Sequence, residues 1–77
     1  MSKGNLYINI DHLRDMKSMN DHFNISEIIK CGNEHIANEG TVIIQQEYSN
    51  NEPTEVIRLD NIYSFKAWTD DFFKMAV

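Results

Sequence analysis

Two runs of β-forming residues decide the fold: TVIIQQEY at positions 41–48 and TEVIRL at positions 54–59. Valine, isoleucine, threonine and tyrosine are enriched in strands because their side chains pack well on a pleated, half-buried surface. The segment between the runs, SNNEP at positions 49–53, has the composition of a turn. Together these segments predict an antiparallel β-hairpin with a loop of about four or five residues.

The register of this hairpin follows from its charge pattern. One alignment places Ile44 opposite Ile57. A shift by one residue would place Glu47 opposite Glu55, and like charges directly opposite each other destabilise a sheet. Because the same shift would move every side chain to the other face, we expect the first alignment.

A strand and a helix precede the hairpin. Positions 6–10 (LYINI) alternate between apolar and polar residues, which is typical of a strand with one buried face. Isoleucines at helical spacing predict a helix over residues 25–38, with Asn24 as its N-cap. Gly40 is expected to end this helix with a positive φ angle. Residues 11–24 are interpreted as either a short helix or a loop, because apolar residues recur at helical spacing among weak helix formers.

A second helix is expected after the hairpin, with Asp60 or Asn61 as its N-cap. Its apolar residues fall on one stripe at helical spacing: Phe65, Trp68, Phe72 and Ala76. Of the adjacent pair Phe72 and Phe73, one is expected at the edge of the core, because neighbours on a helix point about 100° apart. This stripe predicts that Trp68 packs in the core.

The length of the chain predicts a single domain over residues 1–77. The expected order of elements is strand, helix, strand, strand, helix, and a helix between the first two strands indicates a crossover connection. Both helices must cover the same apolar face of the sheet. The sequence therefore predicts an α+β fold, a two-layer sandwich with a small, mostly antiparallel sheet and the helices on one face.

The charge balance restricts the partners. The sequence has twelve acidic and seven basic residues, which gives a net charge of −5. Residues 1–38 hold five acids and four bases, whereas residues 39–77 hold seven acids and three bases. An acidic surface repels nucleic-acid phosphates but attracts basic protein surfaces, so we expect a basic protein partner and no direct nucleic-acid binding. A single cysteine and the lack of an apolar run of about 20 residues predict a cytoplasmic protein without a membrane partner.

Catalytic motifs are absent from the sequence. The glycines at positions 4, 32 and 40 are too scattered to form a phosphate-binding loop. Cys31 and His35 would share a helix face and could ligate one metal ion, with His12 and His22 completing the site. Structural roles are more common for such residues, since cysteine often packs as a small hydrophobe. We therefore predict no catalytic residue, no metal and no cofactor, and we expect the protein not to be an enzyme.

Two surfaces are candidate partner-binding sites. One comprises the acids of the hairpin and of the residue after it: Glu47, Glu52, Glu55 and Asp60. Alternate residues on a strand lie about 6.6–6.8 Å apart, close to two nucleotide steps of DNA, so a carboxylate row at this spacing suits a basic groove built for nucleic acid. The other is the sheet face that the helices leave open, where apolar and aromatic residues mix with polar ones: Tyr7, Ile43 and Val56.

These features predict a non-catalytic protein-binding module. In size and charge, although by no motif, the chain resembles the small inhibitors that phages use against host defence systems, such as anti-restriction and anti-CRISPR proteins. The resemblance implies an acidic inhibitor that occupies a basic, nucleic-acid-binding surface of its partner. The alternative is a homo-oligomeric structural or adaptor subunit, a homodimer in the simplest case, that pairs through its open sheet face.

Overall fold

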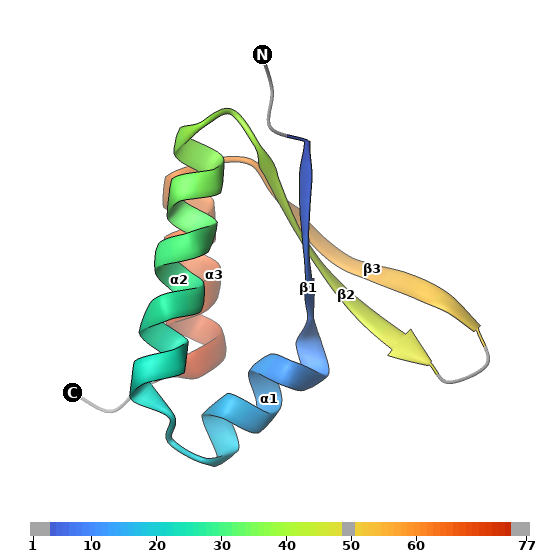
Figure 1. Cartoon of the computed structure of the whole chain (residues 1–77), viewed down its shortest axis with the longest axis vertical. Helices are drawn as coiled ribbons and strands as arrows, with labels where there is room; N and C mark the ends of the chain where they lie inside the picture. Colours follow the sequence, from blue (N-terminus) through green and yellow to red (C-terminus); the bar gives the residue numbers. More distant parts are fainter. Residues whose placement is uncertain (1–3, 49–50, 75–77) are drawn as a thin grey trace.

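The computed structural model describes residues 4–48 and 51–74. These residues form three helices and a three-stranded mixed sheet in the order β-α-α-β-β-α (Figure 1). The predicted small α+β fold is therefore confirmed, and the structure adds one helix in the segment that the sequence left open between helix and loop.

β2 (Thr41–Tyr48) is the central strand of the sheet. β1 (Asn5–Asn9) lies beside it in parallel, and β3 (Asn51–Leu59) lies on its other side in antiparallel orientation. Parallel neighbours require a crossover connection. Two helices provide it here, α1 (Ile10–Ser18) and α2 (His22–Ala37), so the crossover predicted between the first two strands is present.

The hairpin has the predicted register at its base, where Ile44 lies opposite Ile57. Farther along, Gln45 lies opposite Glu55, which leaves Val56 as an extra residue in β3. Such a β-bulge bends and twists the strand that carries it. The expected alternation of faces along β3 therefore ends at Val56.

β3 begins at Asn51, earlier than the predicted start at Thr54. Pro53 consequently lies inside a strand, which proline tolerates at the edge of a sheet because its missing N–H faces away from the ladder. A second register shift lies between Gln46 and Tyr48 on the partner strand. Ser49 and Asn50, from the predicted turn, lie outside the described residues.

Each helix begins beside a side chain that caps its free N–H groups. Asn9 Oδ1 accepts from the N–H of Asp11 at 2.9 Å, so α1 begins directly at the end of β1. Asp21 caps α2 in place of the predicted Asn24, whose own side-chain amide donates to the Asp21 carboxylate at 2.6 Å. α3 (Ile62–Phe73) is capped by Asn61, one of its two predicted caps.

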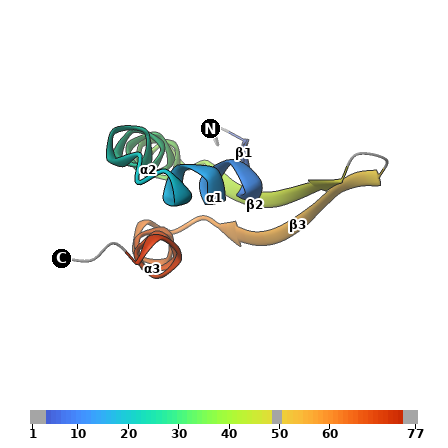
Figure 2. The same cartoon turned by 90° about the horizontal axis from the view of Figure 1, so that it is seen from below.

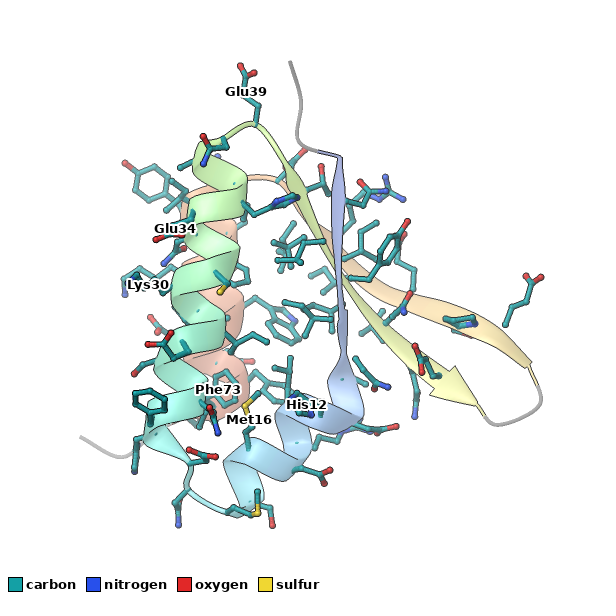
Figure 3. The ribbon with its side chains drawn as sticks, viewed as in Figure 1. His12, Met16, Lys30, Glu34, Glu39 and Phe73 are labelled. Carbon is teal, nitrogen blue, oxygen red and sulfur yellow. The ribbon has the colours of Figure 1, made fainter. Side chains whose placement is uncertain are left out.

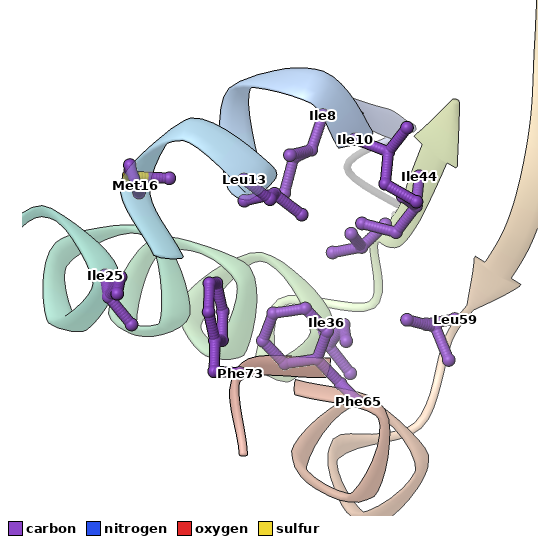
Figure 4. Close-up of a cluster of buried hydrophobic side chains, with 11 residues drawn as sticks. Ile8, Ile10, Leu13, Met16, Ile25, Ile36, Ile44, Leu59, Phe65 and Phe73 are labelled. Carbon is purple, nitrogen blue, oxygen red and sulfur yellow. The ribbon is translucent and has the colours of Figure 1, made fainter. Parts of the chain in front are cut away.

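The core lies between the sheet and the helices (Figure 4). α2 and α3 lie next to each other and cover one face of the sheet, so the two-layer arrangement is confirmed (Figures 1 and 2). α1 closes the lower end of the core in the view of Figure 1. The buried side chains come from every element: Ile8, Ile10, Leu13, Met16, Ile25, Ile36, Val42, Ile44, Leu59, Phe65 and Phe73.

α3 is rotated relative to the predicted stripe. Phe65, Thr69 and Phe73 are its buried residues, whereas Trp68 and Phe72 are only half-buried and stack on each other with ring centroids 5.0 Å apart. Phe72 is thus the edge residue of the adjacent phenylalanine pair. Ala76 lies outside the described residues.

The cause of this rotation is Gly32 on α2. A Cβ atom at Gly32 would overlap the ring of Phe65, so the absence of a side chain there lets α3 approach the backbone of α2. Phe65 is 1% exposed, and its ring lies against Gly32 at the contact between the two helices.

Gly32→Ala tests this contact. Helix propensity alone would stabilise the variant by about 1 kcal/mol, whereas overpacking a filled core costs about 1–3 kcal/mol. We expect a net loss of stability in urea unfolding followed by Trp68 fluorescence. Adding Phe65→Leu to Gly32→Ala should recover part of the loss. A single variant more stable than the wild type would contradict the proposed contact.

The turn after α2 differs from the expectation for Gly40. Glu39 adopts the left-handed conformation, with φ 66°, and Gly40 has no positive φ. Gly40 is required for a different reason: a Cβ there would overlap the ring of His35. His35 Nε2 lies 2.9 Å from the Gly4 carbonyl oxygen, which also accepts from the N–H of Thr41 at 3.0 Å. His35 thus joins the end of α2 to the residue that precedes β1.

Two adjacent substitutions should have opposite effects. Gly40→Ala should destabilise the fold by about 1–3 kcal/mol, because the methyl group displaces the His35 ring. Glu39→Gly should be stabilising by up to about 1 kcal/mol, because glycine adopts positive φ without the steric cost of a Cβ. Thermal melts of both variants measure this contrast, and equal shifts in the same direction would refute the assignment.

Candidate protein interface

The outer half of the hairpin forms an arm that extends beyond the rest of the molecule. β1 pairs with β2 only as far as Gln45, so from there onward β2 and β3 pair only with each other. Figures 1 and 2 show this part of the hairpin projecting away from the helices. We call its described residues, 46–48 and 51–56, the hairpin arm.

The hairpin arm is acidic. It carries Glu47, Glu52 and Glu55, all of which are exposed. No lysine or arginine occurs in the sequence between Lys30 and Arg58. The arm is therefore a negatively charged projection without a basic residue of its own.

Arg58 compensates one of these carboxylates. Its Nη2 lies 2.9 Å from Glu55 Oε1, and both side chains remain about half exposed. The hydrogen bond and the negative charge of Glu55 raise the pKa of Arg58 further above its ordinary value. Exposed pairs of this kind contribute little to stability, but the pair reduces the net charge at the base of the arm. Glu47 accepts a long hydrogen bond from the Gln45 side chain at 3.4 Å.

The four predicted acidic residues do not form one cluster. Asp60 follows the end of β3 at Leu59, which pairs with Val42 at the end of the hairpin opposite the arm. The register shifts also break the alternation of β3. The evenly spaced row of carboxylates expected from the sequence is therefore not formed, and Glu55 is placed opposite Gln45.

The open face of the sheet offers less apolar surface than expected. Tyr7 and Val56 are 57% and 48% exposed, but Ile43 is 2% exposed although it lies on this face, between Tyr7 and Arg58 in register. Ile43 therefore offers almost no accessible surface to a binding partner.

Cys31 and His35 both lie on α2 and line a shallow hollow of about 280 Å³ together with Leu6, Glu34 and Asn38. Sequence spacing places the four α2 residues on one helix face. No sequence signal indicated Leu6, because its position depends on the parallel pairing of β1 with β2. In the part of the chain that the structure describes, no three His, Cys, Asp or Glu side chains are arranged to hold a metal ion.

Zinc should therefore leave the melting temperature unchanged. A structural zinc site contributes strongly to folding stability, whereas here His35 already uses Nε2 to bond the Gly4 carbonyl. Differential scanning fluorimetry with zinc, and separately with a chelator, measures this. A chelator-induced loss of structure, abolished by Cys31→Ser, would show that the prediction is wrong.

No family model matches this chain, and no curated protein or solved structure is significantly similar to it. Among residues 4–48 and 51–74, no helix is long and apolar enough to cross a membrane. The function must therefore be inferred from the physical properties of the surface.

Proposed function

We propose that this chain is a non-catalytic protein-binding module whose hairpin arm docks on a basic surface of a partner protein. The observation that carries the proposal is the arm itself: an exposed projection with three glutamates and no basic residue. Projection matters because a two-stranded arm can enter a groove that the wider body cannot enter. Charge matters because a basic groove concentrates field lines and attracts an acidic projection.

The proposal extends to inhibition. A basic groove on a protein commonly serves to bind nucleic-acid phosphates, which contribute a large part of the affinity. An acidic arm seated in such a groove excludes the nucleic acid by occupying its site. In this form the chain acts as a competitive inhibitor of a nucleic-acid-binding protein, the role that its size and charge suggest.

Charge-neutral variants test the role of the arm. Glu47→Gln with Glu52→Gln removes two charges from the arm, and Glu27→Gln with Asp71→Asn removes two exposed charges from the helices. Each tagged protein is used to capture partners from cells that contain it, followed by quantitative mass spectrometry. We expect the arm variant to lose a partner that the wild type and the helix variant retain.

Kinetics with the captured partner sharpen this test. Exposed charges act mainly on the association rate and its salt dependence. The arm variant should therefore associate more slowly and with a weaker dependence on salt, and duplex DNA or RNA should compete with the wild type for the partner. If the arm variant and the helix variant lost binding equally, the overall charge of the protein, and not the arm, would explain the loss. If nucleic acid did not compete with the wild type for the partner, the inhibitor role would be refuted.

A second candidate function is favoured by the exposure of Tyr7 and Val56 on the open sheet face. Two copies could pair through this face to form a homo-oligomeric adaptor. A standard interface buries about 800 Å² per partner, and the burial of Ile43 reduces the apolar area on offer. Analytical ultracentrifugation of the wild type and of Tyr7→Ser with Val56→Ser decides between a dimer and a monomer.

A further inference from the structure

In the described part of the chain, β1 is an edge strand of the sheet that carries none of the usual protecting residues. Natural proteins protect exposed strand edges with proline, charged residues and bulges. β3, at the other edge, has Pro53, several charged residues and two register shifts. β1 has none of these: its sequence is NLYIN, and its register against β2 is unbroken from Asn5 to Asn9.

The backbone of β1 presents hydrogen-bonding groups to an added strand. The Gly4 carbonyl faces β2, because it accepts from the N–H of Thr41. Backbone groups alternate in direction along a strand, so those of Leu6 and Ile8 also face β2. The N–H and C=O groups of Asn5 and Tyr7 consequently face away from the sheet, and both residues are exposed.

The hollow beside Leu6 would receive a side chain from such a strand. Three of its lining residues offer hydrogen-bond acceptors. His35 Nε2 donates to the Gly4 carbonyl, and in the tautomer with its one proton on Nε2 the Nδ1 atom is an acceptor. Asn38 Nδ2 donates to the Glu34 carbonyl oxygen at 2.7 Å, which leaves Oδ1 as an acceptor. The Glu34 carboxylate only accepts.

This set of acceptors selects a long cationic side chain. Lysine and arginine carry several donors and no acceptor. Leu6 and Cys31 offer less polar surface for the aliphatic stem, and such stems commonly lie along apolar surface. Figure 3 shows Glu34 on the side of α2 away from β1, so a side chain from an added strand must be long to approach its carboxylate.

We propose that β1 binds an extended basic segment of a partner protein as a fourth strand, with a lysine or arginine side chain in the hollow. The backbone of Asn5 and Tyr7 pairs with the segment, and the acceptors of Glu34, His35 and Asn38 select its charge. This site is separate from the hairpin arm, and it does not depend on the function proposed for the arm.

NMR titration with a designed peptide tests the site. The probe is acetyl-Thr-Val-Arg-Val-Thr-amide, which favours an extended conformation. Amide signals of Asn5 and Tyr7 and of residues 31–38 should shift as the peptide is added. The same peptide with Glu in place of Arg should bind at least about tenfold more weakly, because it loses the charge-assisted hydrogen bonds.

Two controls separate strand addition from general attraction. A strand pairs through one edge only, so N-methylation of the peptide at alternate residues should abolish binding in one of the two methylated forms and not in the other. Glu34→Gln should weaken binding by about tenfold, whereas Asp71→Asn, which removes an equal charge from α3, should not.

Other outcomes would overturn the proposal. Shifts confined to Glu47, Glu52 and Glu55 would place the peptide on the hairpin arm, and equal binding of both methylated peptides would show that no strand is added. Shifts of β1 signals with rising protein concentration alone would make a second copy the occupant. Each result leaves the arm variants as an independent test of the function proposed above.

Discussion

Both candidate surfaces depend on the point at which β1 ends. Asn9 is the last residue of that strand and also the N-cap of α1, where its side chain accepts from the N–H of Asp11. A residue that caps a helix cannot continue a strand beyond it, so the pairing of β1 with β2 stops at Gln45. The rest of the hairpin has no third strand beside it and becomes the projecting arm. A longer β1 would cover part of the arm and extend the sheet.

The second constraint is the approach of α3 to α2 at Gly32. Because the Phe65 ring lies against the backbone of α2, the two helices are held together as one layer over the sheet. The position of α2 in turn places Cys31, Glu34, His35 and Asn38 beside Leu6. The contact between Gly32 and Phe65 therefore helps to determine the shape of the hollow, although neither residue lines it.

The features that local or charge-based interactions determine could be predicted from the sequence. The position of Ile44 opposite Ile57 followed from the penalty of pairing Glu47 with Glu55. The features that tertiary contacts determine could not be predicted in this way. The rotation of α3, which buries Thr69 and Phe73 more deeply than Trp68, depends on Gly32 in another helix. Pro53 was a signal of an edge or a bulge, and its interpretation as part of a turn concealed the early start of β3.

Binding at the hairpin arm and binding at the edge of β1 should differ in their dependence on salt. The arm carboxylates are exposed, and interactions of exposed charges are largely screened beyond about 8 Å at physiological ionic strength. The arm should therefore act mostly on the encounter with a basic partner, and its effect should fall as salt rises. Backbone pairing along β1 involves neutral groups and is affected far less, so at this site salt weakens only the contact of the cationic side chain with Glu34. A partner that used both surfaces would be attracted by the arm and retained by the edge of the sheet, so high salt would slow its binding without releasing it.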